Sequence, residues 1–203
     1  MLLMFVGSAV LRILERHVEE QRVAEALESA EARTQRLRGE AFAALKADLA
    51  SFEEGGVLVV DEFARSIELR DVSFRPGSAC LSERARAAIE RVGPRIAEML
   101  QNDTSLNVII EGHTDPVPVG RLKNSCGYFA TNTQLAAQRG INVRSLIATE
   151  NAPELRTRLP VLGWGPDRLR NTEDETAPEN RRVELRFSWM DSGAPGLEFA
   201  TQL

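Results

Sequence analysis

The feature that most constrains this chain is a long N-terminal stretch without helix breakers. Residues 8–52 contain no proline and a single glycine, and they are rich in Ala, Glu, Arg, Leu and Gln, which favour helix with few exceptions. Apolar residues recur mostly three or four positions apart, as in an amphipathic helix: Leu11, Leu14, Val18, Val23, Leu27, Ala30, Leu37, Ala41, Leu45 and Leu49. The phase drifts near Arg22 and Thr34, so a regular coiled coil is only weakly indicated. We therefore expect one long helix, which is either a stalk or dimer contact outside a core, or a helix packed on its own domain.

The first residues, MLLMFVGSAVL (1–11), are apolar and uncharged. As a helix they would rise about 16 Å, roughly half of a bilayer's hydrocarbon core. A secretory signal fits weakly, because no basic segment precedes the run and no small-residue cleavage site follows it. We expect the end of a truncated transmembrane helix, and the alternative is a buried helix end.

Composition indicates a folded soluble domain and disfavours a nucleic-acid partner. The 203 residues are 43% hydrophobic and 27% charged, enough for one domain of about 130 residues with extensions. The net charge of −5, with acids interspersed among the arginines, lacks the basic patch that a phosphate backbone requires. Cys80 and Cys126 are too few for a disulfide framework or a four-ligand zinc site. They form either one bridge, in an oxidising compartment, or two separate buried thiols.

The remaining chain predicts alternating strands and helices. The sequence EEGG (53–56) breaks the long helix. Strands are expected at 57–60, 66–74, 106–112, 159–165 and 181–189, and helices at 83–101, capped by Ser82, and at 132–149. Residues 166–180 have almost no apolar side chains and predict a solvated loop. The order β-β-α-β-α-β-β is typical of an α+β fold with its helices on one face of the sheet.

A histidine between two carboxylates, in EGHTD (111–115), raises the question of a metal or acid–base site. Glu111, His113 and Asp115 would share one face if a strand ran that far, but Gly112 and Pro116 argue that it does not. The other histidine lies in the long helix, and no cysteine pair has ligand spacing. Nucleophile-elbow, phosphate-loop and dinucleotide-binding motifs are absent. We therefore expect no enzyme activity, no metal and no cofactor.

Two interpretations of EGHTD remain. Thr114 and Asp115 either hydrogen-bond the loop backbone at the end of a strand, or belong to a ligand site. The second interpretation gains support from NTQLAAQRG (132–140), where Asn132, Leu135 and Arg139 lie on one face of a helix. Asn132 stands at the expected helix start, where its side chain could cap free amides.

Four segments in this order resemble the OmpA C-terminal-like, or OmpA/MotB, peptidoglycan-binding domain. They are IIEGHTD (109–115), N-x-x-L-x-x-x-R (132–139), GWG (163–165) and NRRVELRF (180–187). The resemblance covers about residues 55–190 and implies an OmpA-like βαβαβ sandwich, a mixed sheet with two helices on one face, preceded here by the long N-terminal helix. The apolar run followed by a helix is also similar to the end of the transmembrane helix in MotB-type stator subunits, a group that includes ZorB-like subunits of phage-defence systems.

The resemblance implies binding of the peptidoglycan stem peptide, at diaminopimelate. Asp115 matches the family's ligand aspartate and Arg139 its ligand arginine, while Asn132 and Leu135 shape the helix start and Thr114 joins the ligand set. An aspartate suits the ammonium of this zwitterion, and an arginine fork suits its carboxylate. Free helix amides would add affinity for the anion. The strand arginines Arg181 and Arg182 either support this site or pair with Glu184 or Glu111 across the sheet.

These inferences divide the chain into four parts: 1–11, the apolar segment; 12–54, a helical linker or stalk; 55–190, the OmpA-like domain; and 191–203, a tail. The expected function is non-catalytic wall binding that anchors a membrane protein or complex. The alternatives are a stator-like subunit of an ion-driven motor or phage-defence complex, and a structural domain without wall binding. We expect a single-pass inner-membrane protein with its domain in the periplasm, outer-membrane association being the alternative. Expected partners are peptidoglycan, the membrane, a second copy through residues 12–54 and a MotA-like membrane protein, but no nucleic acid.

Overall fold

A computed structural model describes residues 2–75, 77–119, 126–148 and 152–190. The expected long helix is present as α1 (Leu2–Glu54). By their internal contacts the residues form two units, 1–42 and 43–203, so α1 begins in the first and ends in the second. Every described side chain from Arg12 to Leu37 is exposed. The structure does not describe the side chains of residues 1–11 or the residues after 190. The apolar segment and the tail expected there therefore stay predictions. Within the described residues no helix combines the length and apolarity needed to cross a membrane.

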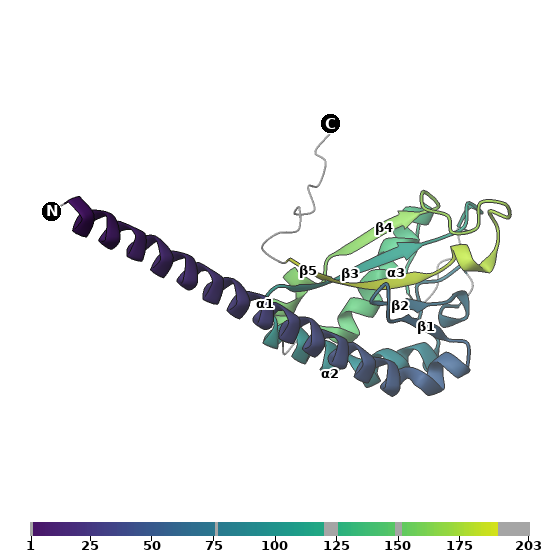
Figure 1. The fold of residues 1–203 in the computed structure, drawn as a ribbon. Coiled ribbons are helices and arrows are strands. Elements are labelled where there is room, and N and C mark those ends of the chain that lie inside the picture. Colours follow the sequence, from purple (N-terminus) through teal and green to yellow (C-terminus); the bar gives the residue numbers. More distant parts are fainter. Residues whose placement is uncertain (1, 76, 120–125, 149–151, 191–203) are drawn as a thin grey trace. The chain divides into compact units, whose positions relative to one another are not determined.

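The second unit is built on a mixed sheet (Figure 1). Its described strands are β1 (Leu58–Asp61), β2 (Ser66–Leu69), β3 (Leu106–His113), β4 (Val161–Gly165) and β5 (Val183–Trp189). They lie in the order β1-β2-β5-β3-β4. The β3–β4 pair is parallel and the other pairs are antiparallel. With α2 (Glu83–Asn102) and α3 (Asn132–Ile147) against the sheet, this confirms the expected α+β class and element order.

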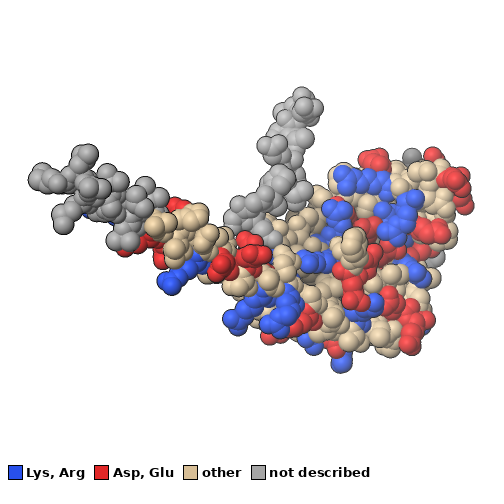
Figure 2. All heavy atoms as spheres, viewed as in Figure 1, with Lys and Arg blue, Asp and Glu red and all other residues tan. Residues whose placement is uncertain are grey.

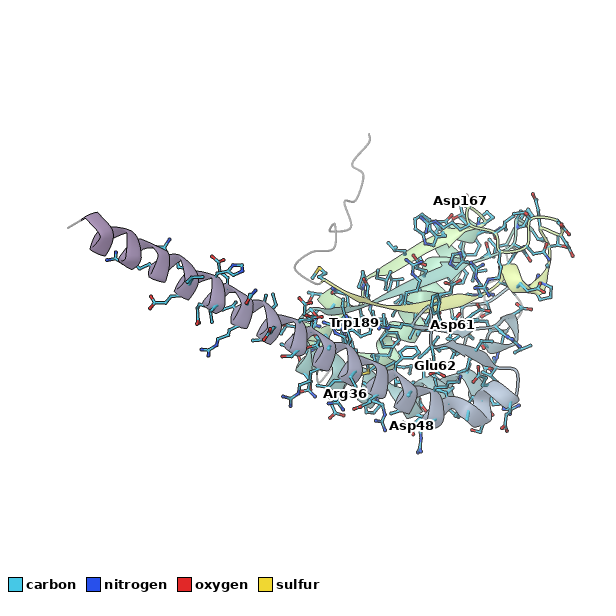
Figure 3. The ribbon with its side chains drawn as sticks, viewed as in Figure 1. Arg36, Asp48, Asp61, Glu62, Asp167 and Trp189 are labelled. Carbon is cyan, nitrogen blue, oxygen red and sulfur yellow. A yellow bond between two sulfur atoms is a disulfide. The ribbon has the colours of Figure 1, made fainter. Side chains whose placement is uncertain are left out.

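The helices follow local signals that the sequence carries. The Ser82 hydroxyl accepts a hydrogen bond from the Ala85 amide at 3.3 Å, which confirms the predicted cap of α2. The buried face of α2 is the apolar stripe Ala85, Ala88, Ile89, Val92, Ile96 and Leu100. Residues 43–54 of α1 lie beside α2 (Figure 1). The carboxylate of Asp48, which Figure 3 labels on α1, accepts from Arg95 Nε of α2 at 2.9 Å. Leu45 and Leu49 on this part of α1 are fully buried.

Glycines let α3 approach the sheet closely. A Cβ on Gly112 of β3 would stand 2.1 Å from the Ala136 carbonyl oxygen. A Cβ on Gly140 of α3 would stand 2.7 Å from Val161 Cγ1 on β4. Gly140 therefore costs α3 some helix propensity but permits its contact with the sheet.

Three expected strands are shorter than the sequence predicted, and the one expected at 159–165 begins at Val161. The strand expected at 66–74 ends at Leu69, and the 3₁₀ turn η1 (Asp71–Ser73) follows it. Two bonds make this turn, from Ser73 N–H to the Arg70 carbonyl at 2.8 Å and from Phe74 N–H to the Asp71 carbonyl at 3.0 Å. The last strand begins at Val183 rather than at 181, after the turn η3 (Pro178–Asn180). The other short turn is η2 (Pro153–Arg158).

The expected solvated loop at 166–180 is ordered by one buried side chain. The Asn180 side-chain oxygen accepts from the Arg170 and Asn171 amides at 2.8 and 2.9 Å. Its Nδ2 donates to the carbonyls of Asn171, Asp174 and Glu175 at 2.9, 3.3 and 2.9 Å. This single amide therefore closes the loop directly before Arg181.

Candidate ligand-binding site

The site begins where β3 runs into its loop. The Thr114 amide donates to the Gly165 carbonyl at 2.9 Å and ties the loop to the end of β4. Asp115 follows with 8% of its surface exposed. Its Oδ1 accepts from the Val117 amide at 3.2 Å, and its Oδ2 accepts from Arg181 Nη1 at 2.7 Å. The Thr114 hydroxyl is buried and has no partner among the described residues.

Asn132 does not cap α3, contrary to expectation. The cap is Thr131, which has extended backbone and whose hydroxyl accepts from the Gln134 amide at 3.2 Å. Asn132 is therefore the first helical residue, and its Nδ2 donates to the Asp115 and Val117 carbonyls at 3.0 and 2.9 Å. This clamp fixes the start of α3 against the loop that carries Asp115.

Arg139 lies one to two turns into α3 and is 2% exposed. Its Nε donates to the Ser78 carbonyl at 3.0 Å, and its Cζ lies 4.8 Å from the centroid of the Phe74 ring. Its Nη1 has no hydrogen-bond partner in the described part of the chain. Burial lowers the pKa of Arg139 to about 10, against the raising effect of Asp71 and of Asp115, so the guanidinium is charged at neutral pH. A buried cation that leaves a hydrogen-bond donor unpaired lowers the stability of the fold, unless an acceptor pairs with that donor.

Arg181 links two carboxylates beside Arg139. Its Nε and Nη2 donate to Asp71 at 2.9 and 3.0 Å, while Nη1 donates to Asp115 at 2.7 Å and to the Thr176 carbonyl at 2.8 Å. The hydrogen bond to Asp71, followed by the one to Asp115, raises the pKa of Arg181. Asp71 is a site residue that the sequence did not indicate. It lies 110 positions from Arg181 and in a segment that predicted a strand, so no local signal could have found it.

Leu135 supplies an apolar wall at the start of α3. It is 4% exposed and clusters with Ala79 and Phe129, against which Val119 and Cys126 pack. The structure therefore places Asp115, Asn132, Leu135 and Arg139 close to one another, with Arg181, which the sequence offered as a supporting residue. It adds Asp71 through Arg181.

Arg182 points elsewhere, into a row of ion pairs across the sheet. Glu68, Glu184 and Glu111 are register partners on β2, β5 and β3. Glu184 Oε1 accepts from Arg182 Nε at 2.7 Å and from Arg170 Nη2 at 2.9 Å, which confirms the alternative that one strand arginine pairs with Glu184. On the face drawn in Figure 2, acidic and basic residues are likewise interspersed.

A metal site was the other interpretation of EGHTD. As expected, the strand does not reach Asp115: β3 ends at His113, one residue beyond the predicted end, so Glu111 and His113 share a face and Asp115 follows in the loop. Within the described residues, ligand atoms of Glu111, His113 and Glu184 lie within 4.8 Å of one another. Asp115 is outside this group because it turns toward Arg181.

The charges around His113 oppose a cation. Neither of its ring nitrogens has a hydrogen-bond partner among the residues described. Burial lowers the pKa of His113 to about 4, and the positive charge of Arg182 acts in the same direction. Arg168 and Arg186 lie 4.0 and 3.6 Å from Glu111. These guanidinium groups neutralise the carboxylates that a metal would need, so the arrangement suits an ion-paired sheet surface better than a metal centre.

The two cysteines form a disulfide, which resolves the alternatives left by the sequence. Cys80 and Cys126 are bonded, with their Cα atoms 5.4 Å apart. The bridge connects the segment before α2 to the loop between β3 and α3.

Residues 73–183 match the OmpA family. The match covers more than half of the chain and includes every ligand-site residue named above except Asp71. This protein therefore belongs to the OmpA family.

Solved structures with the same fold come from bacterial envelope proteins. The cell wall anchor of the T6SS from Pseudomonas aeruginosa is 22% identical, with a TM-score of 0.53 over 71% of this chain and 96% of that one. The periplasmic domain of Helicobacter pylori MotB is 19% identical, with a TM-score of 0.50 over 68% and 90% of the two chains. At these identities the likeness concerns the fold. No curated protein matches the chain.

Proposed function

We propose that this protein is a non-catalytic peptidoglycan-binding module that anchors a membrane protein or complex to the cell wall. The observation that carries the proposal is Arg139, a buried guanidinium whose Nη1 has no partner among the described residues. Family membership and the likeness of fold to a cell wall anchor support the same conclusion.

The site is suited to a zwitterion, an ammonium beside a carboxylate. Arg139 Nη1 can donate a charge-assisted hydrogen bond to the ligand carboxylate. Asp115 can accept from the ammonium, because each of its oxygens carries one described hydrogen bond and has a second lone-pair direction free. The diaminopimelate side chain of a stem peptide presents this pair of charges. Binding of this kind requires no nucleophile and no metal.

The proposal is tested with purified sacculi and two conservative variants. Arg139→Lys keeps the charge but loses the fork, and Asp115→Asn keeps the shape but loses the charge. Each removes a charge-assisted hydrogen bond of about 1.5–3 kcal/mol, so sacculus retention should weaken by roughly 10- to 100-fold. Arg86→Lys on the exposed side of α2 is the matched control and should bind like wild type. If both site variants retain sacculi as wild type does, the site assignment fails.

The ligand is tested in the same assay by competition. Free meso-diaminopimelate should displace the protein from sacculi, whereas Nα-acetyl-lysine amide, which has an ammonium but no carboxylate, should compete at least tenfold less well. Equal competition by the two would contradict the role given to Arg139.

We also propose that the module is periplasmic, tethered to the inner membrane through its N-terminal segment, and paired with a second copy through residues 12–54. The exposed apolar side chains of α1 support the pairing: Leu14, Val18, Val23, Leu27 and Leu37 are 50–59% exposed. A MotA-like partner and a stator-like role would follow from co-purification with a multi-span membrane protein. Fractionation of cells that produce the full chain tests its location.

A further inference from the structure

The disulfide lies next to the backbone that holds Arg139. Cys80 follows Ser78 and Ala79, and these two residues supply the carbonyls that fix the buried face of α3. The Ser78 carbonyl accepts from Arg139 Nε at 3.0 Å, and the Ala79 carbonyl accepts from Asn142 Nδ2 at 2.8 Å. The Cys80 amide in turn donates to the Ser78 hydroxyl at 3.0 Å. The position of Arg139 therefore depends on where this short segment is held.

The other half of the bridge lies beside apolar side chains at the start of α3. Cys126 packs on the cluster of Ala79, Phe129 and Leu135. Leu135 belongs to the ligand site, and Phe129 precedes the cap of α3 by two residues. The bridge thus joins the carbonyls behind Arg139 to the loop that leads into α3.

The disulfide also borders a hollow of about 410 Å³, so a reductant can approach it. Arg75 and Arg86 line this hollow with Glu83 and both cysteines. The excess of positive charge favours a thiolate as the leaving group in disulfide exchange.

We propose that the Cys80–Cys126 disulfide positions Arg139 and makes wall binding sensitive to redox state. This inference rests on the proposed function. A dithiol reductant would open the bridge in two steps. One of its thiolates attacks a cysteine sulfur and expels the other cysteine as a thiolate. The second thiolate of the reductant then displaces the first cysteine. Two electrons and two protons pass to the protein, and the reductant leaves as a disulfide.

Without the bridge, the segment of Ser78 and Ala79 and the loop at Cys126 move independently. The bond between Arg139 Nε and the Ser78 carbonyl then loses its alignment, and the guanidinium no longer aims Nη1 at the ligand. Because this bond is misaligned rather than removed, sacculus retention should weaken about fivefold, which corresponds to about 1 kcal/mol.

The test compares full-length oxidised protein, protein reduced with dithiothreitol, and the Cys80→Ser/Cys126→Ser variant, with thiols counted by mass after alkylation. The reduced protein and the variant should bind sacculi about fivefold less tightly than the oxidised protein.

An NMR measurement distinguishes a loss of Arg139 positioning from a loosening of the whole domain. The NMR signal of Arg139 Nε–H should exchange faster with solvent after reduction. The control is Arg158, whose Nε donates to the Leu106 carbonyl at the same distance of 3.0 Å, far from the bridge. Its signal should not change.

Unchanged binding and an unchanged Arg139 signal in fully reduced protein would overturn the inference. Loss of both arginine signals would also overturn it, because the bridge would then support the whole domain rather than the site. If oxidised protein fails to bind sacculi at all, the proposed function fails. The NMR comparison then still decides whether the bridge positions Arg139.

Discussion

Two buried side chains show how differently the domain treats a basic group. Arg139 keeps its charge inside the protein because Phe74, the Ser78 carbonyl and the nearby carboxylates Asp71 and Asp115 stabilise it. His113 is just as buried, and burial, with the positive charge of Arg182 acting in the same direction, lowers its pKa to about 4 and keeps the ring neutral at pH 7. Arg139 therefore presents a charged donor, Nη1, that has no partner among the described residues. Protonation of His113 at low pH should lower the stability of the folded domain.

His113 should make the domain sensitive to acid. Its pKa is about 4 when folded and about 6.5 when unfolded, so the unfolded chain binds the proton first as pH falls. The stabilising contribution of the neutral ring is complete above pH 6.5 and is lost toward pH 4, with about 2 kcal/mol gone by pH 5. Urea denaturation should show that wild type loses about 2 kcal/mol more unfolding free energy between pH 7 and pH 5 than His113→Gln does. His17→Gln on exposed α1 is the control, and an equal loss in all three proteins would refute the assignment.

Some single residues of the site could be predicted and others could not. Asp115 and Arg139 stand in segments whose spacing and family resemblance indicated them, and the helix periodicity brought Asn132 and Leu135 to the same face. Asp71 depends on a contact across 110 positions, and which strand arginine meets Asp115 depends on where β5 begins. Because β5 begins at Val183, Arg181 lies before the strand, free to reach two carboxylates, while Arg182 is held beside Glu184.

At the scale of elements, periodicity and breakers predicted the order of strands and helices, and the errors lie at their ends. The cap at Ser82 could be predicted from the sequence because the helix that follows it has a clear apolar stripe. Thr131 and Asn132 are both good caps, and only the backbone and the loop after β3 decide between them. The turn at Asp71–Ser73 forms where a strand was expected, because each of its backbone hydrogen bonds closes within four residues. The alternation of apolar and polar side chains does not predict such bonds.

The closeness of α3 to the sheet should make Gly112 irreplaceable. In Gly112→Ala the new Cβ would stand 2.1 Å from a backbone oxygen of α3, so the helix must move rather than a side chain. Overpacking of this kind costs about 1–3 kcal/mol of unfolding free energy, and displacement of α3 should also weaken sacculus binding through Arg139. Gly39→Ala is the matched control, because no described atom lies within 4 Å of its added Cβ. It should raise helix stability by up to about 1 kcal/mol. Equal stability of the two variants in urea denaturation would contradict the packing argument.

At the scale of the whole molecule, an OmpA-family domain and a long helix are combined in one chain. If the domain binds the wall as proposed, the helix would influence how strongly the protein is held there. Val23, Leu27, Ala30, Thr34 and Leu37 follow alternating steps of four and three along α1. The Thr34 hydroxyl is satisfied by the Ala30 carbonyl at 2.9 Å, so it can lie within an apolar stripe. A second copy pairing along this stripe would bury the exposed apolar side chains and place two binding domains on one stem.

Such pairing should multiply wall affinity without any new contact to the ligand. Once one domain is bound, its partner meets the wall at an effective concentration near the millimolar range, so retention should exceed that of a single domain by roughly 100-fold. Leu27→Glu places a charge in the stripe and should give a monomer by light scattering, with a matching loss of sacculus retention and an unchanged response to free diaminopimelate. Ser29→Glu adds the same charge on the opposite side of α1 and should leave both the dimer and its retention intact. A wild-type monomer at micromolar concentration, or full retention by Leu27→Glu, would show instead that each domain holds the wall alone and that the helix serves only as a spacer.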